Sequence, residues 1–456
     1  MSMGARLSFG IKAGFTGGQV AGQVLRDIPS LLLLFYLTSV VGMEPAIAGT
    51  TIFVPKLIFG ILSDIGIGIA SDRLIDRFPR RRWLLLAAVL APIAMILLFQ
   101  VPAASTGLQA AYVFVVMSLY MLGFSAASVP YLAQYSEITE SPRERTVLMA
   151  WRHGFTGAGI VVGSAMAPAL IHHVGGGRWG YGITSCVLAA ICTLSLLIAY
   201  GAASRIPVRA VRNTPRVDLR ALAGVFAYRP FRILVALFFM QEVGAGMTGA
   251  SIAFFLTYCL KMPNALGNLG IIALLAGFVV MLASPVWIAV SRRIGKMRSY
   301  LVGAVAHGLL LLAWALSSEH TPVSVIFAIS AAIGLANSGW GIMVLALLGD
   351  MIADSTAATG EDHGGAFSAV WTLAEKIGLA LGATLIAGNM LSAFGFSAAK
   401  ALHGEAQQAS ALLGIAITFG FVPAAINVAA ALLYWRSGRP AGSQASLLES
   451  VAHEPS

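Results

Sequence analysis

Charged residues are scarce in this chain of 456 residues: only 11% are Asp, Glu, Lys or Arg, while 58% are hydrophobic. Soluble globular proteins carry about 25% charged residues, so this chain cannot cover its surface with charge as they do. Its mean hydropathy is +0.84, and apolar runs of roughly 18 or more residues, the length that spans a bilayer, recur along it. The composition excludes a soluble globular protein and indicates an integral membrane protein.

Cysteine is also scarce. Cys186, Cys192 and Cys259 lie in apolar segments at spacings that suit neither disulfides nor a metal site, so we interpret them as packing residues. The sequence has no Walker-type phosphate loop, no zinc-binding His-Glu-x-x-His and no strand–nucleophile–helix signature. We therefore expect a protein that is not an enzyme and that binds no metal and no cofactor.

The formal net charge is +10, which in a soluble protein would favour a nucleic-acid partner. Here the basic residues are spread over short segments between the apolar runs, a distribution typical of membrane topology. We predict that the partners are the lipid bilayer and a small-molecule substrate, not nucleic acid, and that the chain functions as a monomer.

The apolar runs predict an all-α membrane protein with twelve transmembrane helices. Their expected bounds are 12–42, 46–75, 83–101, 108–136, 147–173, 178–203, 230–260, 266–291, 299–317, 322–353, 364–393 and 408–436. Pro and Gly occur inside many of them, which membrane helices tolerate because neighbouring helices satisfy the freed backbone groups.

Basic residues gather on one side of these predicted helices. That side carries the clusters at 6–12, 77–82, 143–145, 205–220, 292–298 and 436–439, whereas the other side has only Arg178, Lys261 and Lys400. By the positive-inside rule the basic side faces the cytoplasm. We therefore expect both termini in the cytoplasm and the protein in the cell (plasma or inner) membrane.

The longest connection divides the helices six and six. We predict an N-terminal six-helix bundle at 1–203, a cytoplasmic central loop at 204–229, a C-terminal six-helix bundle at 230–436 and a cytoplasmic tail at 437–456. Each bundle has a basic turn after its second helix. Two such pseudo-symmetric bundles are typical of major facilitator transporters, which bind substrate near the membrane midplane between the halves.

Three motifs resemble a narrower family. They run from Asp64 through Gly68 to Ser71-Asp72-Arg73, from Arg143-Glu144-Arg145-Thr146 to Trp151-Arg152, and from Ala353-Asp354 through Phe367-Ser368 to Lys376-Ile377-Gly378. In this order they resemble the glycoside–pentoside–hexuronide:cation symporters, the family of the melibiose carriers. The resemblance implies the major facilitator fold and sugar uptake coupled to Na⁺, H⁺ or Li⁺.

The resemblance also implies roles for single residues. Asp64 corresponds to a cation-site carboxylate, Lys376 to its partner on the eleventh helix, and Arg152 to a substrate-facing guanidinium. Gln23 and Ser128 stand where melibiose carriers have acidic residues, and we include both in the predicted substrate site.

A further departure concerns the coupling ion. Gly60 stands where many members of the family have a second acidic residue, one turn before Asp64. A Na⁺ site needs several converging oxygens, so the lone acid on this helix favours H⁺ over Na⁺. The missing acids also leave open an alternative: a transporter or exporter of a non-sugar solute, such as a drug, a lipid-like or a pigment-related compound.

Eight ionisable residues lie inside the predicted helices: Arg26, Asp27, Lys56, Asp64, Arg152, Glu242, Glu375 and Lys376. A charge at the bilayer centre costs at least about 2.5–3.5 kcal/mol on insertion scales, so such residues face a protein interior or an aqueous cavity and find partners. We predict cation or proton coupling by Asp27 together with Asp64 and Lys376. Ion pairs that only hold the helices together are the alternative.

Helix geometry limits the possible pairs. Lys56 and Asp64 share one helix face but lie about 12 Å apart along the axis, so they cannot bond each other. Arg26 and Asp27 point about 100° apart, so we expect separate partners for them. Lys56 has two open interpretations: a family-like basic residue shifted by one position, or a partner for Asp27.

The predicted substrate site includes Arg26 and Glu242 as well as three uncharged residues. Trp340 and Trp371 are predicted to stack on a sugar ring, with Thr372 as a polar neighbour; the alternative for each tryptophan is core packing. The glycines of the fifth helix, Gly154, Gly157, Gly159 and Gly163, are interpreted as surfaces for close helix packing.

A cytoplasmic gate is predicted at the basic ends of the helices, formed by Asp72, Arg73, Arg145 and Asp354. The function that these features indicate is secondary active transport by alternating access, with H⁺- or Na⁺-coupled symport of a sugar, glycoside or related small organic solute.

Overall fold

The computed structural model describes residues 7–138, 142–206, 224–226, 228–359 and 364–436. Within these ranges the regular secondary structure is helical. The predicted tail at 437–456 and most of the predicted central loop at 204–229 lie outside the described residues.

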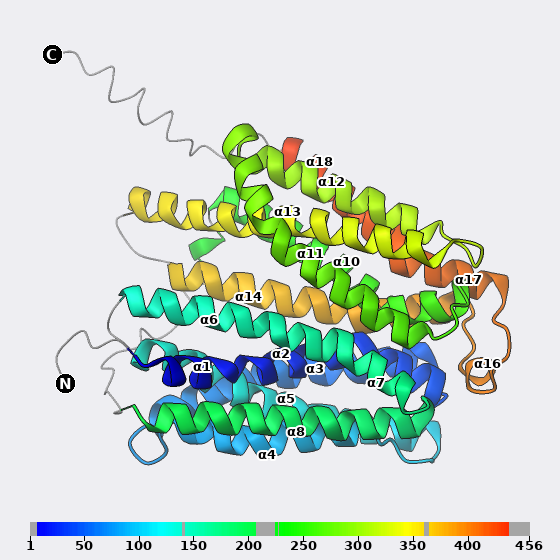
Figure 1. Cartoon of the computed structure of the whole chain (residues 1–456), viewed down its shortest axis with the longest axis horizontal. Helices are drawn as coiled ribbons and strands as arrows, with labels where there is room; N and C mark the ends of the chain where they lie inside the picture. The colour runs from blue at the N-terminus through cyan, green and yellow to red at the C-terminus, as the bar shows by residue number, and fades with distance from the viewer. Residues whose placement is uncertain (1–6, 139–141, 207–223, 227, 360–363, 437–456) are drawn as a thin grey trace.

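The first half of the chain forms one group of helices, drawn below the other in Figure 1. Its elements are α1 (Phe9–Gly17), α2 (Gln19–Ile28), η1 (Pro29–Leu33), η2 (Tyr36–Val40), α3 (Pro45–Arg73), α4 (Arg80–Leu98), α5 (Thr106–Ile138), α6 (Pro142–Ile160), η3 (Val161–Met166), α7 (Ala167–His173) and α8 (Gly177–Ser204).

The second half forms the other group. Its elements are α10 (Arg229–Phe254), η4 (Phe255–Cys259), α11 (Ala265–Ile294), α12 (Lys296–Ala315), α13 (Val323–Thr359), α14 (Gly364–Ala380), η5 (Leu381–Ile386), α15 (Ala387–Ala393), α16 (Ala398–Leu402), α17 (Ala409–Ala416), η6 (Ile417–Phe421) and α18 (Val422–Arg436). Here η denotes a short π-helical segment that continues the preceding helix.

Within the described residues, 11 helices are long and apolar enough to cross a membrane. The remaining predicted crossing is the run from α1 to η2, which the structure builds from consecutive short segments instead of one regular helix. Together they form the predicted two bundles of a major facilitator fold.

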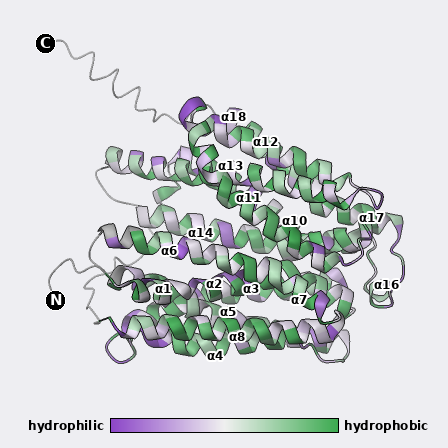
Figure 2. Cartoon of the chain, in the orientation of Figure 1, coloured by the Kyte–Doolittle hydropathy of each residue, from purple (hydrophilic) through white to green (hydrophobic). Residues whose placement is uncertain are grey.

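The surface between the helix ends is apolar. Leu62, Val89, Val115, Phe278 and Leu309 each expose more than half of their surface, far more than a soluble protein of this size leaves in one broad belt. In Figure 2 hydrophobic colour covers most of the length of the helices, and hydrophilic colour gathers toward their ends and at isolated sites between. The chain is therefore an integral membrane protein.

Five of the six π-helical segments in the described residues fall in equivalent crossings of the two halves. The six segments occur in the first and seventh crossings (η1, η2 and η4), in the fifth and eleventh (η3 and η5), and in the twelfth (η6). The first and seventh crossings are equivalent in a six-plus-six repeat, as are the fifth and eleventh. Since π-helical turns are frequent at functional sites, these four crossings are where a site between the halves is expected.

The two halves pack closely through glycines at the helix ends opposite the basic turns. A Cβ atom on Gly49 of α3 would lie 2.3 Å from the carbonyl oxygen of Thr384, and one on Gly388 of α15 would lie 2.4 Å from that of Pro45. Real side chains do not approach backbone this closely, so only glycine permits the contact. Nearby, the backbone N–H of Ala46 donates to the Ser392 hydroxyl at 3.2 Å.

This glycine contact gives a prediction. Gly49→Ala should push α3 and α15 apart, lower stability by about 1–3 kcal/mol through overpacking, and raise the labelling rate of a cysteine introduced at Ser392. Thermal unfolding of the purified protein and maleimide labelling measure both effects. Gly66→Ala, on the same helix with open space around its Cβ position, is the control. Equal behaviour of the two variants would contradict the contact.

Candidate functional site

Charged side chains from both halves meet in the middle of the membrane-spanning helices. We call Arg26, Asp27, Ser30, Lys56, Asp64, Glu375 and Lys376 the central cluster. The Arg26 and Lys376 side chains are each 47% exposed, although they lie inside membrane-spanning segments. Because both contact acids of the opposite half, the space to which they are exposed lies between the halves rather than in the lipid.

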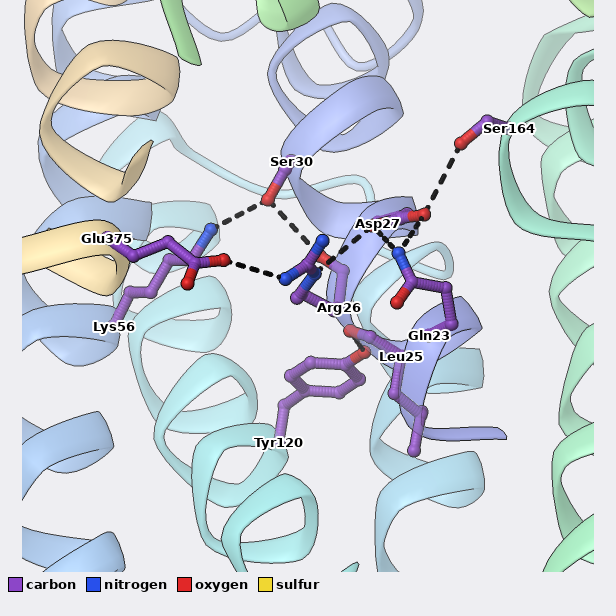
Figure 3. A network of polar contacts seen from close by, with 9 residues as sticks. All are labelled: Gln23, Leu25, Arg26, Asp27, Ser30, Lys56, Tyr120, Ser164 and Glu375. Atoms are coloured by element: carbon purple, nitrogen blue, oxygen red, sulfur yellow. Dashed lines mark hydrogen bonds and ion pairs between the residues drawn. The ribbon is translucent and has the colours of Figure 1, made fainter. Parts of the chain in front are cut away.

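The sequence of α2 and η1 explains how four polar residues reach this space. Gln23, Arg26, Asp27 and Ser30 follow the i, i+3, i+4, i+7 spacing of one helix face. Pro29 has no N–H, so the regular hydrogen bond to the carbonyl of Leu25 cannot form there. The buried hydroxyl of Tyr120 donates to that carbonyl instead, as Figure 3 shows. The interrupted helix continues as the π-helical segment η1, which starts at Pro29.

Asp27 has several partners on its own side of the cluster. The Gln23 amide nitrogen donates to its two carboxylate oxygens at 2.9 and 2.8 Å, and the Ser164 hydroxyl lies 3.5 Å from one of them. Gln23 is only 4% exposed, so in this arrangement it positions Asp27 and does not line the cavity as predicted.

One geometric expectation about this helix needs correction. Arg26 and Asp27 were expected to have separate partners, but the Arg26 Nε lies 3.5 Å from an Asp27 carboxylate oxygen. The long, flexible Arg side chain bends across the 100° between the two positions. Arg26 also has the separate partner that was expected, Glu375.

Two ion pairs join the halves. Arg26 Nη1 lies 2.9 Å from Glu375 Oε1, and Lys376 Nζ lies 2.5 Å from Asp64 Oδ2. The Ser125 hydroxyl of α5 donates to the other oxygen of Asp64 at 2.6 Å. The structure thus brings together the Asp64 and Lys376 side chains that the family resemblance had matched.

Lys56 does not bond Asp27, the acid considered as its partner. Its Nζ donates to the Ser30 hydroxyl at 2.9 Å, and the Ser30 hydroxyl lies 3.2 Å from the carbonyl oxygen of Arg26. Within the described part of the chain, no carboxylate lies within ion-pair distance of Lys56.

The other predicted charged residues lie around this cluster. Arg152 Nε donates to the Gln19 side chain at 3.0 Å, and its guanidinium lies 5.6 Å from the centre of the Tyr135 ring. Glu242 on α10 packs against Gly378 of α14 and is close enough to Arg26 for their charges to interact.

The two tryptophans that were predicted to stack on a sugar pack in the protein core instead. Trp371 is 5% exposed and stacks on Phe238 at 3.9 Å between ring centroids. Trp340 is 6% exposed and lies against His307. Both belong to the core of the C-terminal half. Thr372, in contrast, is exposed.

Among the predicted gate residues whose side chains are described, none forms an ion pair with another across the halves. Asp72 pairs with Arg80 of the same half, and Arg73 is exposed while Asp354 is half-buried. The Arg145 side chain lies outside the described residues. The neighbouring acid Asp350 pairs with Lys296 at 2.6 Å, again within one half.

The glycines of the fifth crossing and Ser128 are the remaining predicted positions of the N-terminal half, and the glycines differ in how closely they pack. A Cβ on Gly159 would lie 2.5 Å from the Gln23 Cβ, so this glycine packs closely on α2, whereas Gly154 and Gly157 have open space around them. Ser128 is half-buried, and its hydroxyl has no hydrogen-bond partner among the described residues. The predicted packing role therefore fits Gly159 and fails for Gly154 and Gly157.

Comparisons with known proteins identify the family. The family model described as MFS/sugar transport protein matches residues 14–437. The chain belongs to this family. It is therefore a transporter and not an enzyme, and its resemblance to the glycoside–pentoside–hexuronide:cation symporters is confirmed.

Individual relatives match this chain over most of their length. The transporter is 27% identical over 433 residues to "Uncharacterized symporter YnaJ" of Bacillus subtilis (strain 168). The aligned region covers 93% of this chain and 90% of the relative. The transporter is 25% identical over 413 residues to the isoprimeverose transporter of Lactiplantibacillus pentosus, which covers 87% of this chain and 82% of the relative.

The solved structures support the fold. A bacterial homologue of the human lysosomal transporter Spinster, in an inward-facing and unoccupied conformation, superposes with a TM-score of 0.70 at 16% identity, covering 94% of this chain and 96% of the other. At this identity the likeness shows the major facilitator fold alone.

Sequence reasoning missed some contacts of the transporter's cluster. Glu375 was recognised as an intramembrane charge, but nothing in the sequence showed that it pairs with Arg26. Ser125 and Ser30 carry no signal that separates them from other serines in apolar helices. Within the described residues no group of three His, Cys, Asp or Glu side chains could hold a metal ion.

The Arg26–Glu375 pair gives a testable prediction. Arg26→Glu would place two acids opposite each other and should lower the free energy of unfolding by roughly 1–2 kcal/mol, since a part-exposed pair contributes up to about 1 kcal/mol and like-charge repulsion a similar amount. Adding Glu375→Arg should recover most of this loss in thermal unfolding.

Asp350→Arg, added to Arg26→Glu in place of Glu375→Arg, is the matched control because Asp350 pairs with Lys296 instead. If that control recovers as much stability as Glu375→Arg does, the loss does not come from the pair between the halves.

Proposed function

We propose that this transporter is a cation-coupled symporter that carries a sugar, a glycoside or a related small organic solute by alternating access. One observation carries the proposal: two ion pairs between the halves are exposed to the space between them, in the middle of the membrane. Pairs in this position form and break when the halves move against each other.

The relatives support the solute class. The matching family is described as sugar transport proteins, one relative is named a symporter, and another is named for isoprimeverose. A symporter carries its solute together with a second solute or ion, and the acids of the central cluster are suited to bind a cation.

Asp64 is the proposed coupling residue, with Lys376 as its partner. The Lys376 ammonium lies 2.5 Å from Asp64, where a bound Na⁺ would otherwise approach the carboxylate. A proton needs no such space: protonation of Asp64 removes its charge and releases Lys376. H⁺ is therefore the coupling ion that this geometry favours, and Asp27 is the second acid proposed for coupling.

The arrangement of the halves indicates the state of the transport path. The glycine contacts close the helix ends opposite the basic turns. With the basic ends and both termini placed in the cytoplasm by the positive-inside rule, the closed end is the outer one. This conformation is therefore closed on the outer side.

One observation favours the alternative of a non-sugar solute on the same fold. Trp340 and Trp371, which were predicted to stack on a sugar, pack in the core of the C-terminal half. Arg152, Thr372 and Ser128 remain proposed for substrate contact, together with Arg26 and Glu242.

Asp64→Asn tests the coupling. In liposomes containing the purified transporter, the variant should lose accumulation of solute driven by an imposed pH gradient, because Asn cannot take up and release a proton. It should keep counterflow, which exchanges solute without net proton movement. Uptake of radiolabelled glycosides under both conditions measures the difference.

Asp76→Asn is the control, since Asp76 is an exposed residue of the turn after α3. Accumulation against a gradient by Asp64→Asn would contradict the coupling role. A wild-type protein that accumulates solute with an imposed Na⁺ gradient but not with a pH gradient would replace H⁺ by Na⁺.

A further inference from the structure

The connection between the eleventh and twelfth crossings is the longest described connection at the closed helix ends, which the proposed orientation places on the outer side. It runs from residue 394 to residue 408 and contains the short helix α16. The other described connections at this end are shorter and span 41–44, 99–105, 174–176, 260–264 and 316–322. In Figure 1, α16 lies beyond the helix ends, on the side away from the two chain termini. Although it belongs to the C-terminal half, α16 packs against η2 of the N-terminal half.

The root of this connection is fixed in the C-terminal half. Phe394 packs closely on α17, since a Cβ atom on Gly414 would lie 2.3 Å from the Phe394 Cβ. Phe396 is 2% exposed, and its ring packs edge-on against the rings of Phe254 and Tyr258, with 5.3 Å between ring centroids in both cases. When the C-terminal half moves, the connection therefore moves with it.

Hydrogen bonds close the segment 397–407 into one unit. The Gln407 side chain donates to the Ser397 carbonyl and accepts from the Ser397 N–H, both at 3.0 Å. The Ser397 hydroxyl accepts from the Lys400 N–H at 3.3 Å and thereby caps the start of α16. Gly404 turns the chain back after α16 with a φ of +69°, a conformation that favours glycine. The segment is therefore held together by its own contacts and can move as one piece.

The tip of this unit rests on the N-terminal half. Leu402 covers Gly42 in the turn between η2 and α3, so that a Cβ atom on Gly42 would lie 3.2 Å from Leu402 Cδ2. Gly42 has a φ of +90°, so this position also favours glycine. Tyr258, which packs on the root, donates from its hydroxyl to the Ser39 hydroxyl of η2 at 3.0 Å. The unit and its root therefore contact η2 and the turn that follows it, across the boundary between the halves.

We propose that residues 396–407 form an outer latch: α16 holds η2 against the C-terminal half, and the strength of this contact sets how often the outer side opens. Opening separates η2 from the C-terminal half, so α16 must then leave Gly42. The latch joins the half-exposed Leu402 to a turn, whereas the glycine contacts of α3 and α15 join backbones. A small change in a side chain can therefore weaken the latch without forcing helices apart. This inference rests on the proposed function, because alternating access requires the outer side to open.

Labelling of one cysteine from the outside measures how often the outer side opens. Ser30→Cys places the reporter in the central cluster, and Cys186→Ser and Cys259→Ser remove two native thiols. A membrane-impermeant maleimide, added to right-side-out vesicles that contain the full-length protein, reaches the reporter only through an open outer side. Cys192 is kept, because it is 0% exposed and is labelled only if the protein unfolds.

Two variants of this reporter protein weaken the latch in different ways. Leu402→Ala should raise the labelling rate about 3- to 10-fold, the change expected when a half-exposed leucine loses its apolar contact. Gln407→Leu keeps the size of the side chain but removes both bonds to Ser397, so α16 is no longer braced, and the labelling rate should again rise. Cys192 should stay unlabelled in both variants.

Leu413→Ala is the matched control, since Leu413 of α17 is 53% exposed and lies outside the latch. It should leave the labelling rate of the reporter protein unchanged. Unchanged rates in Leu402→Ala and Gln407→Leu, or an equal rise in the control, would overturn the latch and leave the proposed function intact. A rise that Cys192 shares would come from unfolding and would also count against the latch. If Ser30→Cys is never labelled from the outside, the outer side does not open, which would contradict alternating access as well as the latch.

Discussion

An ionised side chain in the middle of a bilayer needs a partner, because its insertion costs at least about 2.5–3.5 kcal/mol. In this transporter two of these partners lie on the opposite half of the molecule: Glu375 for Arg26 and Lys376 for Asp64. The charges that make the halves costly to insert therefore also draw them together. A structure in which each half satisfied its own charges would have no such link between them.

The contacts between the halves differ in strength, and this determines which of them can break when the halves move. Both pairs are partly open to the space between the halves, and exposed ion pairs contribute about 0–1 kcal/mol each. The glycine contacts of α3 with α15 are of another kind, since the backbones touch and leave no room for a Cβ. The closed end of the path is thus held by close packing, while the central charges can exchange partners at small cost.

Much of the fold could be predicted from the sequence, because apolar runs and loop charge follow directly from the thickness of the bilayer. The Asp64–Lys376 pair also followed from the family motifs. The rotation of each helix about its axis could not be predicted from the sequence. That rotation puts Trp371 against Phe238 rather than in the cavity and turns Gly154 toward open space while Gly159 packs on α2. The bond of Lys56 to Ser30 was not predicted either, because nothing in the sequence separates Ser30 from other serines in apolar helices.

The ion pairs also differ by depth in the membrane. At the basic ends Asp72 bonds Arg80 and Lys296 bonds Asp350, each within a single half, so these pairs are unaffected by a movement of the halves as rigid bodies. At the midplane the pairs cross between the halves and cannot survive such a movement unchanged. Rigid bundles with exchangeable charges between them are what rocking of one half against the other requires. In the transport function that we propose, a solute or cation that replaces one partner of a midplane pair changes the relative energy of the two positions of the halves, and this couples binding to movement.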